Sequence, residues 1–157
     1  MENKIQPQIT VREAHPSEQE AIVQFQTEMA WETEKVTLQP DTIKKGVKAV
    51  FENPHLGSYF IAENNGEVIA SLMVTYEWSD WRNSLVWWLQ SVYVIPQYRR
   101  HGVFSKMYEH IRSLVIENEN VAGIRLYMIH HNEVAGRVYE QMGMDGNHYR
   151  LFEWMKS

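Results

Sequence analysis

A turn rich in cationic and hydrogen-bond-donating groups precedes an amphipathic segment in the second half of the chain. Arg99, Arg100 and His101 are followed by Gly102, and apolar residues then recur from Val103 at spacings of three and four, as on an α-helix. The first backbone N–H groups of a helix lack intrahelical acceptors and lie at the positive end of the helix dipole, so they attract anions such as phosphate. Glycine, which has no Cβ, lets a ligand approach the backbone closely. The turn is a candidate phosphate site, although a solvated basic turn would have the same composition.

A second group of residues shares one face of a short predicted helix nearer the C-terminus. Asn132, Ala135, Tyr139 and Gly143 stand at positions i, i+3, i+7 and i+11, which lie along one line on an α-helix. A helix-start amide and a phenol therefore lie along one line of the predicted helix. A purely structural interpretation is also open, in which Asn132 is the N-cap, Tyr139 is half-buried in the core and Gly143 ends the helix.

Carboxylates flank aromatic residues in two further segments, MAWETE (29–34) and YEWSDW (76–81). The face of a tryptophan ring can hold a cationic amine, and a carboxylate can pair with its charge. The candidates for such contacts are Trp31, Glu32, Glu77, Trp78, Asp80 and Trp81. The same residues would also fit a packed rim with solvated acids. His130 and His131 lack a third ligand at a recognised spacing, so we expect no metal site.

Apolar periodicity and turn signals predict the elements that would position these residues. Helices are predicted to begin at Ser17, where Ser-x-x-Glu indicates a capping box, at Pro40, after Gly102 and at Asn132. Strands are predicted at residues 9–11, on both sides of the Asn65-Gly66 turn, and at residues 85–95, 123–129 and 148–156. The segment 85–95 is apolar on both alternating faces, which is typical of a central strand covered on both sides. This order predicts a mixed α/β domain built around an antiparallel hairpin.

The composition is that of an ordinary globular protein. The chain has 157 residues, 44% of them hydrophobic and 22% charged, so we expect a single domain over residues 1–157. It has no cysteine, which excludes disulfides and is compatible with a reducing, cytoplasmic location. No segment is long and apolar enough to span a membrane, and residues 1–8 have no apolar signal core. The net charge of −5 argues against nonspecific nucleic-acid binding, so we expect neither membrane nor nucleic acid as a partner.

Taken together, the two motifs resemble those of the GNAT acetyltransferase superfamily. That family has a strand, then Arg/Gln-x-x-Gly-x-Gly/Ala opening a helix, then, after another strand, Asn-x-x-Ala-x-x-x-Tyr-x-x-x-Gly-Phe. Here VYVIPQYRRHGVF places Arg99 and Gly102 on the first pattern, and NEVAGRVYEQMGM matches the Asn, Ala, Tyr and Gly of the second. The resemblance covers nearly the whole chain. It implies a GNAT-type α/β fold, with a mixed, mostly antiparallel sheet and helices on both faces.

The resemblance also implies a cofactor, acetyl-CoA, held in a splay between the central strand and the strand after the third helix. Its pyrophosphate would bind the backbone amides of the turn, which comprises Arg99, Arg100, His101, Gly102, Val103 and Phe104. Its pantetheine arm would lie along Val92, Tyr93 and Val94 like an added strand, and Asn132 would contact the arm or order the splay. Members of the family commonly dimerise through their C-terminal strands, so a homodimer is a further expectation.

The sequence departs from the family pattern at two positions. Phe104 stands where the family usually has glycine or alanine, so its side chain must point away from the cofactor. Gln90 stands where many members carry a glutamate that acts as a base, directly or through water. Glutamine cannot accept a proton there, which leaves the base unidentified, and Gln90 is kept as a candidate contact to the acceptor.

The implied reaction moves an acetyl group from a thioester to a primary amine. An alkyl ammonium, with an ordinary pKa of about 10.4, must lose a proton before it attacks. The backbone N–H of Val92 would stabilise the resulting oxyanion, and Tyr139 would protonate the leaving thiolate. We expect N-acetylation of a small molecule, such as a polyamine or an amino-acid-like amine. A protein or peptide acceptor and a noncatalytic acyl-CoA-binding sensor are the alternatives.

Overall fold

Residues 8–157 are described by a computed structural model, in which the chain divides after Arg125 into two compact units. The larger unit contains a five-stranded sheet in the spatial order β1-β2-β3-β4-β5. Its strands are β1 (Ile9–Glu13), β2 (Ser58–Asn64), β3 (Glu67–Ser79), β4 (Ser84–Val94) and β5 (Val121–Arg125). Its α-helices are α1 (Gln19–Glu34), α2 (Pro40–Glu52) and α3 (Val103–Glu117), and the smaller unit contains α4 (Glu133–Gln141). Among the strands of the described residues, only the β4–β5 pair is parallel, which confirms the predicted mixed, mostly antiparallel sheet.

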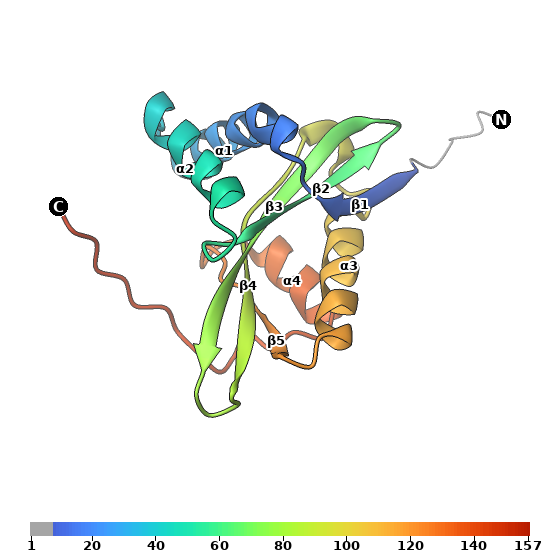
Figure 1. The fold of residues 1–157 in the computed structure, drawn as a ribbon, viewed down its shortest axis with the longest axis vertical. Coiled ribbons are helices and arrows are strands. Elements are labelled where there is room, and N and C mark those ends of the chain that lie inside the picture. Colours follow the sequence, from blue (N-terminus) through green and yellow to red (C-terminus); the bar gives the residue numbers. More distant parts are fainter. Residues whose placement is uncertain (1–7) are drawn as a thin grey trace. The chain divides into compact units, whose positions relative to one another are not determined.

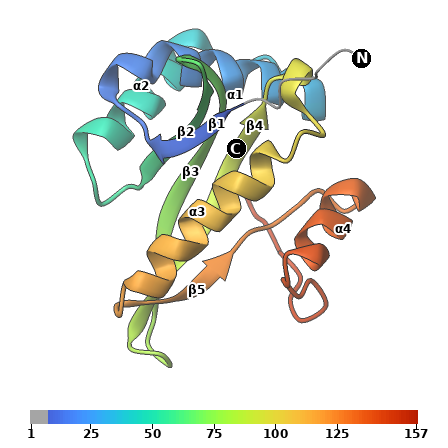
Figure 2. The ribbon, with the colours of Figure 1, turned by 90° about the vertical axis from the view of Figure 1, so that its right-hand side faces the viewer.

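Helices cover both faces of this sheet, as predicted. On β2, Tyr59 packs in a core with Ile22 of α1 and Val47 of α2. The next residue, Phe60, contacts His110 of α3, with 5.9 Å between the ring centroids. Because successive side chains of a strand point to opposite faces, α1 and α2 lie on one face and α3 lies on the other. Figure 1 shows α1 and α2 together on one side of the sheet, and Figure 2 shows α3 crossing the other side.

The start of α1 differs in detail from the prediction. The capping box expected at Ser17 is formed instead by His15 and Glu18, around a short 3₁₀ turn, Pro16–Glu18. The Glu18 carboxylate accepts a hydrogen bond from the His15 backbone N–H at 2.7 Å, and the His15 ring accepts one from the Ser17 N–H at 3.4 Å. The predicted box was therefore wrong by two residues: its acidic partner is Glu18, which also pairs with Arg12 at 2.6 Å, and not Glu20.

The turn between β2 and β3 confirms the hairpin prediction. Asn65 and Gly66 both have positive φ, 51° and 83°, as a two-residue type I′ turn requires. The predicted central strand is also confirmed, since β4 covers nearly the same residues and has neighbours on both edges along part of its length. Among residues 8–157, no helix is long and apolar enough to cross a lipid bilayer.

Two predicted strands were wrong, one in extent and one entirely. β5 occupies Val121–Arg125, so it starts and ends earlier than the predicted 123–129. The expected strand at 148–156 is not formed, and residues such as Phe152 and Trp154 are 90% and 86% exposed. Alternation predicts which faces a strand would have, but strand formation also needs a neighbouring backbone to satisfy its N–H and C=O groups. No such partner is paired with this segment in the described part of the chain.

Candidate functional site

The turn before α3 exposes the start of a 15-residue helix. Arg100 and Gly102 both adopt left-handed backbone conformations, with φ of 65° and 72°. Gly102 is the N-cap, and within the described residues no side chain caps this end of α3. A Cβ built on Gly102 would meet nothing within 4 Å, so the surface there is open. The arrangement presents uncapped N–H groups and the positive end of the helix dipole, which suits an anion.

Other groups of the turn are committed to local contacts. The Arg99 N–H donates to Pro96 at 3.3 Å, so the backbone amides that could meet an anion begin at Arg100. The His101 ring is hydrogen-bonded to the Arg99 carbonyl at 2.9 Å. The Phe104 ring contacts Tyr108 of the same helix, with 6.4 Å between centroids. This contact holds the bulky side chain of Phe104 against its own helix.

The Arg99 side chain ties β4 to α1. Its Nε donates to the Val94 carbonyl at 2.8 Å, and its Nη2 lies 2.7 Å from Glu32 of α1. The guanidinium also lies over the Tyr93 ring, 5.3 Å from the centroid. Glu32, which the sequence suggested as an acceptor contact, is therefore engaged by Arg99.

Tyr93 reinforces the same junction from the buried side. Its hydroxyl donates to Glu28 at 2.7 Å and lies 3.2 Å from Glu32. Burial and the neighbouring carboxylates raise the pKa of Tyr93 well above its ordinary value. The hydroxyl therefore stays protonated and remains a donor to α1. The side chain of Tyr93 has a structural role, which leaves its backbone as the part that could meet a cofactor.

β4 loses its parallel neighbour halfway along its length. Its last pair with β5 is Trp88 with Arg125, so within the described residues the segment 89–94 has only β3 beside it. We call this segment the free half of β4. A strand with one unpaired edge can accept an extended chain as an added strand. The predicted pantetheine contacts, Val92 and Val94, lie in the free half.

A β-bulge interrupts the free half of β4. Gln90 pairs with Met73 and Tyr93 pairs with Ser71, so two residues of β4 face one residue of β3. Ser91 has φ 53°, and its carbonyl accepts a hydrogen bond at 3.2 Å from Gln26, a buried residue of α1. A bulge bends the strand and redirects backbone groups. Val92 directly follows Ser91, so its N–H lies where the regular ladder is broken.

A cavity of about 410 Å³ lies between α1, α2 and the sheet and reaches Ser91. It is lined by Gln26, Met29, Ala30, Thr33, Glu34, Leu38, Ile43, Gly46, Val47, Val50, Tyr59, Met73 and Ser91. Glu34, an acidic residue, is the charged member of this lining. Burial raises the pKa of Tyr59 to about 12, so its hydroxyl is neutral. The cavity therefore combines a mostly apolar wall with one carboxylate, that of Glu34.

The two residues of α1 suggested from the sequence lie outside this cavity. Trp31 is 56% exposed and lies with its ring 5.6 Å from the Lys35 ammonium, and neither Trp31 nor Glu32 lines the cavity. The residues that do line it, Gln26, Met29, Ala30, Thr33 and Glu34, follow the helical spacing of three and four. Continuing that spacing from the buried Ile22 would have selected them.

The other suggested acceptor contacts lie at the opposite end of the sheet. Trp78 and Trp81 are 60% and 90% exposed at the turn joining β3 and β4, and Asp80 accepts a hydrogen bond from the Trp81 N–H at 3.0 Å. Tyr93 comes nine positions after Ser84 in β4, which is about 30 Å of strand. Figure 1 shows this hairpin extending well beyond α1 and α2. The structure does not bring these aromatic residues together with Trp31.

Two predicted polar residues of the sheet are held by neighbouring side chains. Gln90 donates its amide to the Thr75 hydroxyl. Glu77 accepts from the Trp88 indole at 3.1 Å and forms an ion pair with Arg125. Both therefore lie in cross-strand contacts on the larger unit.

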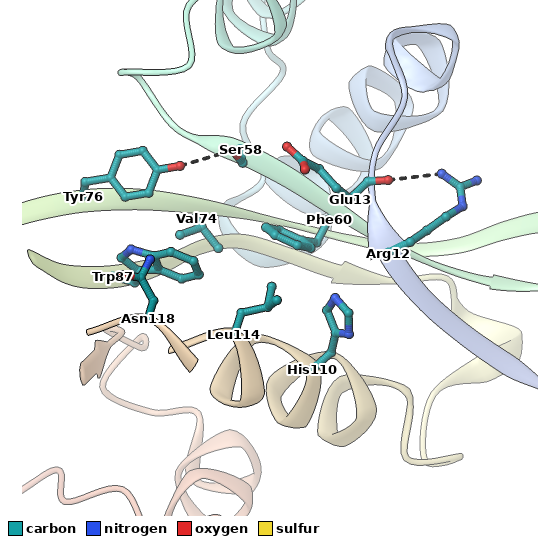
Figure 3. A pocket seen from close by; sticks show the side chains of 10 residues that line it. All are labelled: Arg12, Glu13, Ser58, Phe60, Val74, Tyr76, Trp87, His110, Leu114 and Asn118. Carbon is teal, nitrogen blue, oxygen red and sulfur yellow. Dashed lines mark hydrogen bonds between the residues drawn. The ribbon is translucent and has the colours of Figure 1, made fainter. Parts of the chain in front are cut away.

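A second cavity of about 410 Å³ lies on the α3 face of the sheet. Figure 3 shows Phe60, Val74 and Trp87 of the sheet facing Leu114 and His110 of α3. The residues suggested from the sequence do not line this cavity. Within residues 8–157, no three His, Asp or Glu side chains form a cluster that could hold a metal ion.

In the smaller unit, the C-terminal motif forms α4 with the caps that its sequence indicates. The Asn132 side chain accepts from the Ala135 N–H at 3.1 Å. After the helix, Gly143 has φ 84°, and the Met144 N–H donates to the Tyr139 carbonyl at 3.1 Å. Tyr139 is half-buried, and burial raises its pKa. The phenol therefore keeps its proton at neutral pH and is able to donate it.

Comparison with known proteins agrees with this architecture. Residues 17–144 match the Acetyltransferase (GNAT) family. The chain is 30% identical over 142 residues to a thialysine N-epsilon-acetyltransferase of Mus musculus, covering 85% of this chain and 82% of that protein. A possible acetyltransferase from Clostridium difficile 630 superposes with a TM-score of 0.87 at 38% identity, over 95% of this chain and 98% of that one. A predicted acetyltransferase from Clostridium acetobutylicum, solved with acetyl-CoA, shares the fold, with a TM-score of 0.72 at 17% identity, over 92% of this chain and 96% of that one. The chain therefore belongs to the GNAT acetyltransferase family and is an N-acetyltransferase.

Proposed function

We propose that the protein transfers the acetyl group of acetyl-CoA to a primary amine of a small molecule. The observation that carries this proposal is that the free half of β4 leads directly into the uncapped start of α3. The free half of β4 ends at Val94, and the chain then reaches the uncapped start of α3 through one short turn, Pro96–Tyr98. An extended arm with amide groups could pair along the free half of β4 while its diphosphate meets the start of α3. The related fold solved with acetyl-CoA supports this choice of cofactor.

The cofactor contacts in this proposal come mainly from the backbone. The amides of Arg100, His101, Gly102, Val103 and Phe104 would surround the diphosphate, with the exposed Arg100 side chain adding positive charge. The Arg99 side chain would act indirectly, because it holds the Val94 carbonyl and Glu32. The backbone of residues 92–94 would pair with the pantetheine arm, and Asn132 would contact the arm or order the splay.

For the chemical step, we assign an acid and an oxyanion donor. The N–H of Val92, next to the bulge, would donate to the oxyanion as it forms. The neutral phenol of Tyr139 would give its proton to the departing thiolate. Acetyl-CoA supplies the activated acyl group, and the acceptor amine supplies the nucleophile after losing its own proton.

The cavity beside Ser91 suggests the kind of amine. Its walls include Met29, Ile43 and Met73, which suit an aliphatic chain, and Glu34 suits a cation. A primary amine with an aliphatic body and a second positive charge would satisfy both, as a polyamine or an amino-acid-like amine does. The relative named for thialysine, an amino acid, is in keeping with this class.

The test is a thiol-release assay with acetyl-CoA and a panel of polyamines, amino acids, aminoglycosides and peptides. We expect release with small amines that carry a second charge. Glu34→Gln should raise KM for those amines about tenfold, because the carboxylate pairs with the second charge, and should leave KM for a monoamine of equal length unchanged. Glu20→Gln, on the exposed first turn of α1, is the matched control and should change neither. Release with peptides alone would contradict the proposed acceptor class, and no release with any amine would contradict the proposed reaction.

A further inference from the structure

The structure points to a role for Glu77, Trp88 and Arg125 that is different from acceptor binding: we propose that they form a clamp that fixes where β5 leaves β4 and so positions the cofactor slot. The slot is the open edge along the free half of β4. This inference rests on the proposed function, because the slot matters to catalysis only if acetyl-CoA occupies it.

The clamp spans three neighbouring strands. Glu77 is on β3, Trp88 on β4 and Arg125 at the end of β5. One carboxylate oxygen of Glu77 accepts from the Trp88 indole N–H at 3.1 Å, and the other is paired with the Arg125 guanidinium. Both oxygens of the carboxylate are thus used within the sheet. An acceptor amine would have to displace one of these partners to reach Glu77.

The clamp lies at the last β4–β5 pair. Trp88 and Arg125 are opposite each other, and β4 has no pairing with β5 beyond them in the described residues. The parallel ladder contains only four pairs, from Leu85–Val121 to Trp88–Arg125. Such a short ladder gives the end of β5 little support of its own. A charge-assisted link at the final pair would therefore determine whether the end of β5 stays in place or frays.

The clamp shares a face of the sheet with the cavity. Glu77 and Thr75 lie on the same face as Met73, which lines the cavity, because alternate residues of a strand point the same way. Trp88 pairs with Thr75, and Arg125 pairs with Trp88, so both lie on that face as well. The clamp and the Gln90–Thr75 hydrogen bond form a continuous polar row between the cavity and the hairpin tip. A change in the clamp can therefore reach the slot edge through neighbouring side chains.

The clamp is partly shielded, since the Glu77 and Arg125 side chains are 40% and 29% exposed. Its indole hydrogen bond distinguishes it from an ordinary surface ion pair. By contrast, the pair of Lys48 and Glu52 on α2 has both side chains about 60% exposed, 62% and 58%. That pair is expected to contribute little and serves as the matched control.

The experiment compares Glu77→Gln, Arg125→Gln and the double variant with the wild-type protein and Glu52→Gln. Acetyl-CoA binding is measured by calorimetry, and KM and kcat are measured for both substrates. Each clamp variant should raise Kd and KM for acetyl-CoA about fivefold and leave the KM of the acceptor unchanged. The double variant should show no more than the larger single effect, because either change opens the same link. Arg125→Lys should restore part of the affinity, and Glu52→Gln should change nothing.

Other results would overturn the clamp. If the variants melt earlier but bind acetyl-CoA as the wild-type protein does, the three residues have a structural role only. If Glu77→Gln raises the KM of the acceptor alone and Arg125→Gln has no effect, Glu77 is an acceptor contact. If the wild-type protein itself neither binds acetyl-CoA nor releases thiol, the proposed function fails together with the clamp. Wild-type binding and turnover with unchanged variants would overturn the clamp and leave the proposed function intact.

Discussion

The two halves of β4 are both largely apolar but have quite different surroundings. From Leu85 to Trp88 the strand has β3 on one edge and β5 on the other, whereas the free half of β4 keeps only β3. The bulge at Ser91 and the contacts from Gln26 and Arg99 all fall in the free half. The comparison teaches that the point where β5 ends, and not the residues of β4 themselves, separates the structural half from the half that can bind a ligand.

Unpaired strand edges are usually protected in proteins, because they expose backbone groups that can pair with another chain. Here two carbonyls of the free half already accept side-chain donors, Ser91 from Gln26 and Val94 from Arg99. The edge is thus partly satisfied before any ligand arrives. The following predictions test whether the free half of β4 and the turn after it form the site of catalysis.

The largest expected effect is a loss of kcat when the proposed general acid, Tyr139, is removed. Tyr139→Phe should lower kcat by roughly 10²-fold or more, because the thiolate then leaves without a proton donor. Binding of acetyl-CoA, measured by calorimetry, should be largely retained. Tyr127→Phe, at an exposed position of the same unit, should keep wild-type kcat. A Tyr139→Phe enzyme with full kcat would mean that another group donates the proton.

The pH profile provides a second test of the same residue. Burial raises the pKa of Tyr139, so its neutral, proton-donating form persists beyond about pH 10, where an ordinary phenol ionises. The acid is lost only as the pH rises through that raised value. We therefore expect the alkaline fall in kcat to lie above about pH 10 and to disappear in Tyr139→Phe. An alkaline fall of the same position and size in both proteins would contradict this assignment.

A smaller effect is expected at the turn that follows the free half. Gly102 has φ 72° and an open surface above it, so Gly102→Val should strain the backbone by about 1 kcal/mol and obstruct the approach to the helix start. We expect KM for acetyl-CoA to rise about tenfold, with a modest loss of melting temperature. Gly123→Ala on β5, where a Cβ meets nothing within 4 Å and φ is not positive, should leave KM for acetyl-CoA unchanged. Equal KM values for Gly102→Val and the wild-type protein would place the diphosphate elsewhere.

The smallest effect is expected far from the free half, at the start of α1. Burial acts to raise the pKa of Glu18, but hydrogen bonds from Arg12 and from the His15 backbone outweigh it and lower the pKa. The stability that the ionised carboxylate contributes is therefore present above its ordinary pKa of about 4.3 and is lost as the pH falls through the lowered value. Glu18→Gln should reduce the free energy of unfolding in urea by about 1 kcal/mol at pH 7, without changing kcat.

At acidic pH the wild-type protein and Glu18→Gln should have equal free energies of unfolding. Once the wild-type carboxylate is protonated, it differs little from the glutamine of the variant, so the two unfolding curves should converge. A difference that stays constant between pH 7 and pH 2 would show that Glu18 stabilises the turn by packing and not by charge.

The fold and the α3 turn were predictable because their signals are local. Asn65-Gly66 specifies a tight hairpin, and Gly102 before an apolar period specifies the start of a helix. The lining of the cavity beside α1 was harder to predict, since Trp31 and Glu34 lie in one short run and only the face of the helix separates them. Residue type favoured Trp31, whereas the spacing from the buried Ile22 favoured Glu34.

The remaining features that the sequence did not reveal concern contacts between distant segments. The roles of Glu77 and Arg125 depend on the register of three strands, which a single sequence does not reveal. His15 takes the place of Ser17 as the cap, and its acidic partner Glu18 also pairs with Arg12 of β1. The C-terminal alternation indicated a strand, but an alternating segment becomes a strand only when another backbone pairs with it.

The most direct test of the account is a crystal structure of the protein with acetyl-CoA. We predict that the pantetheine arm lies beside residues 89–94 of β4 and that the diphosphate lies within hydrogen-bonding distance of the backbone nitrogens of Gly102 or Val103. A cofactor bound on the opposite face, in the cavity between α3 and the sheet, would contradict the central claim.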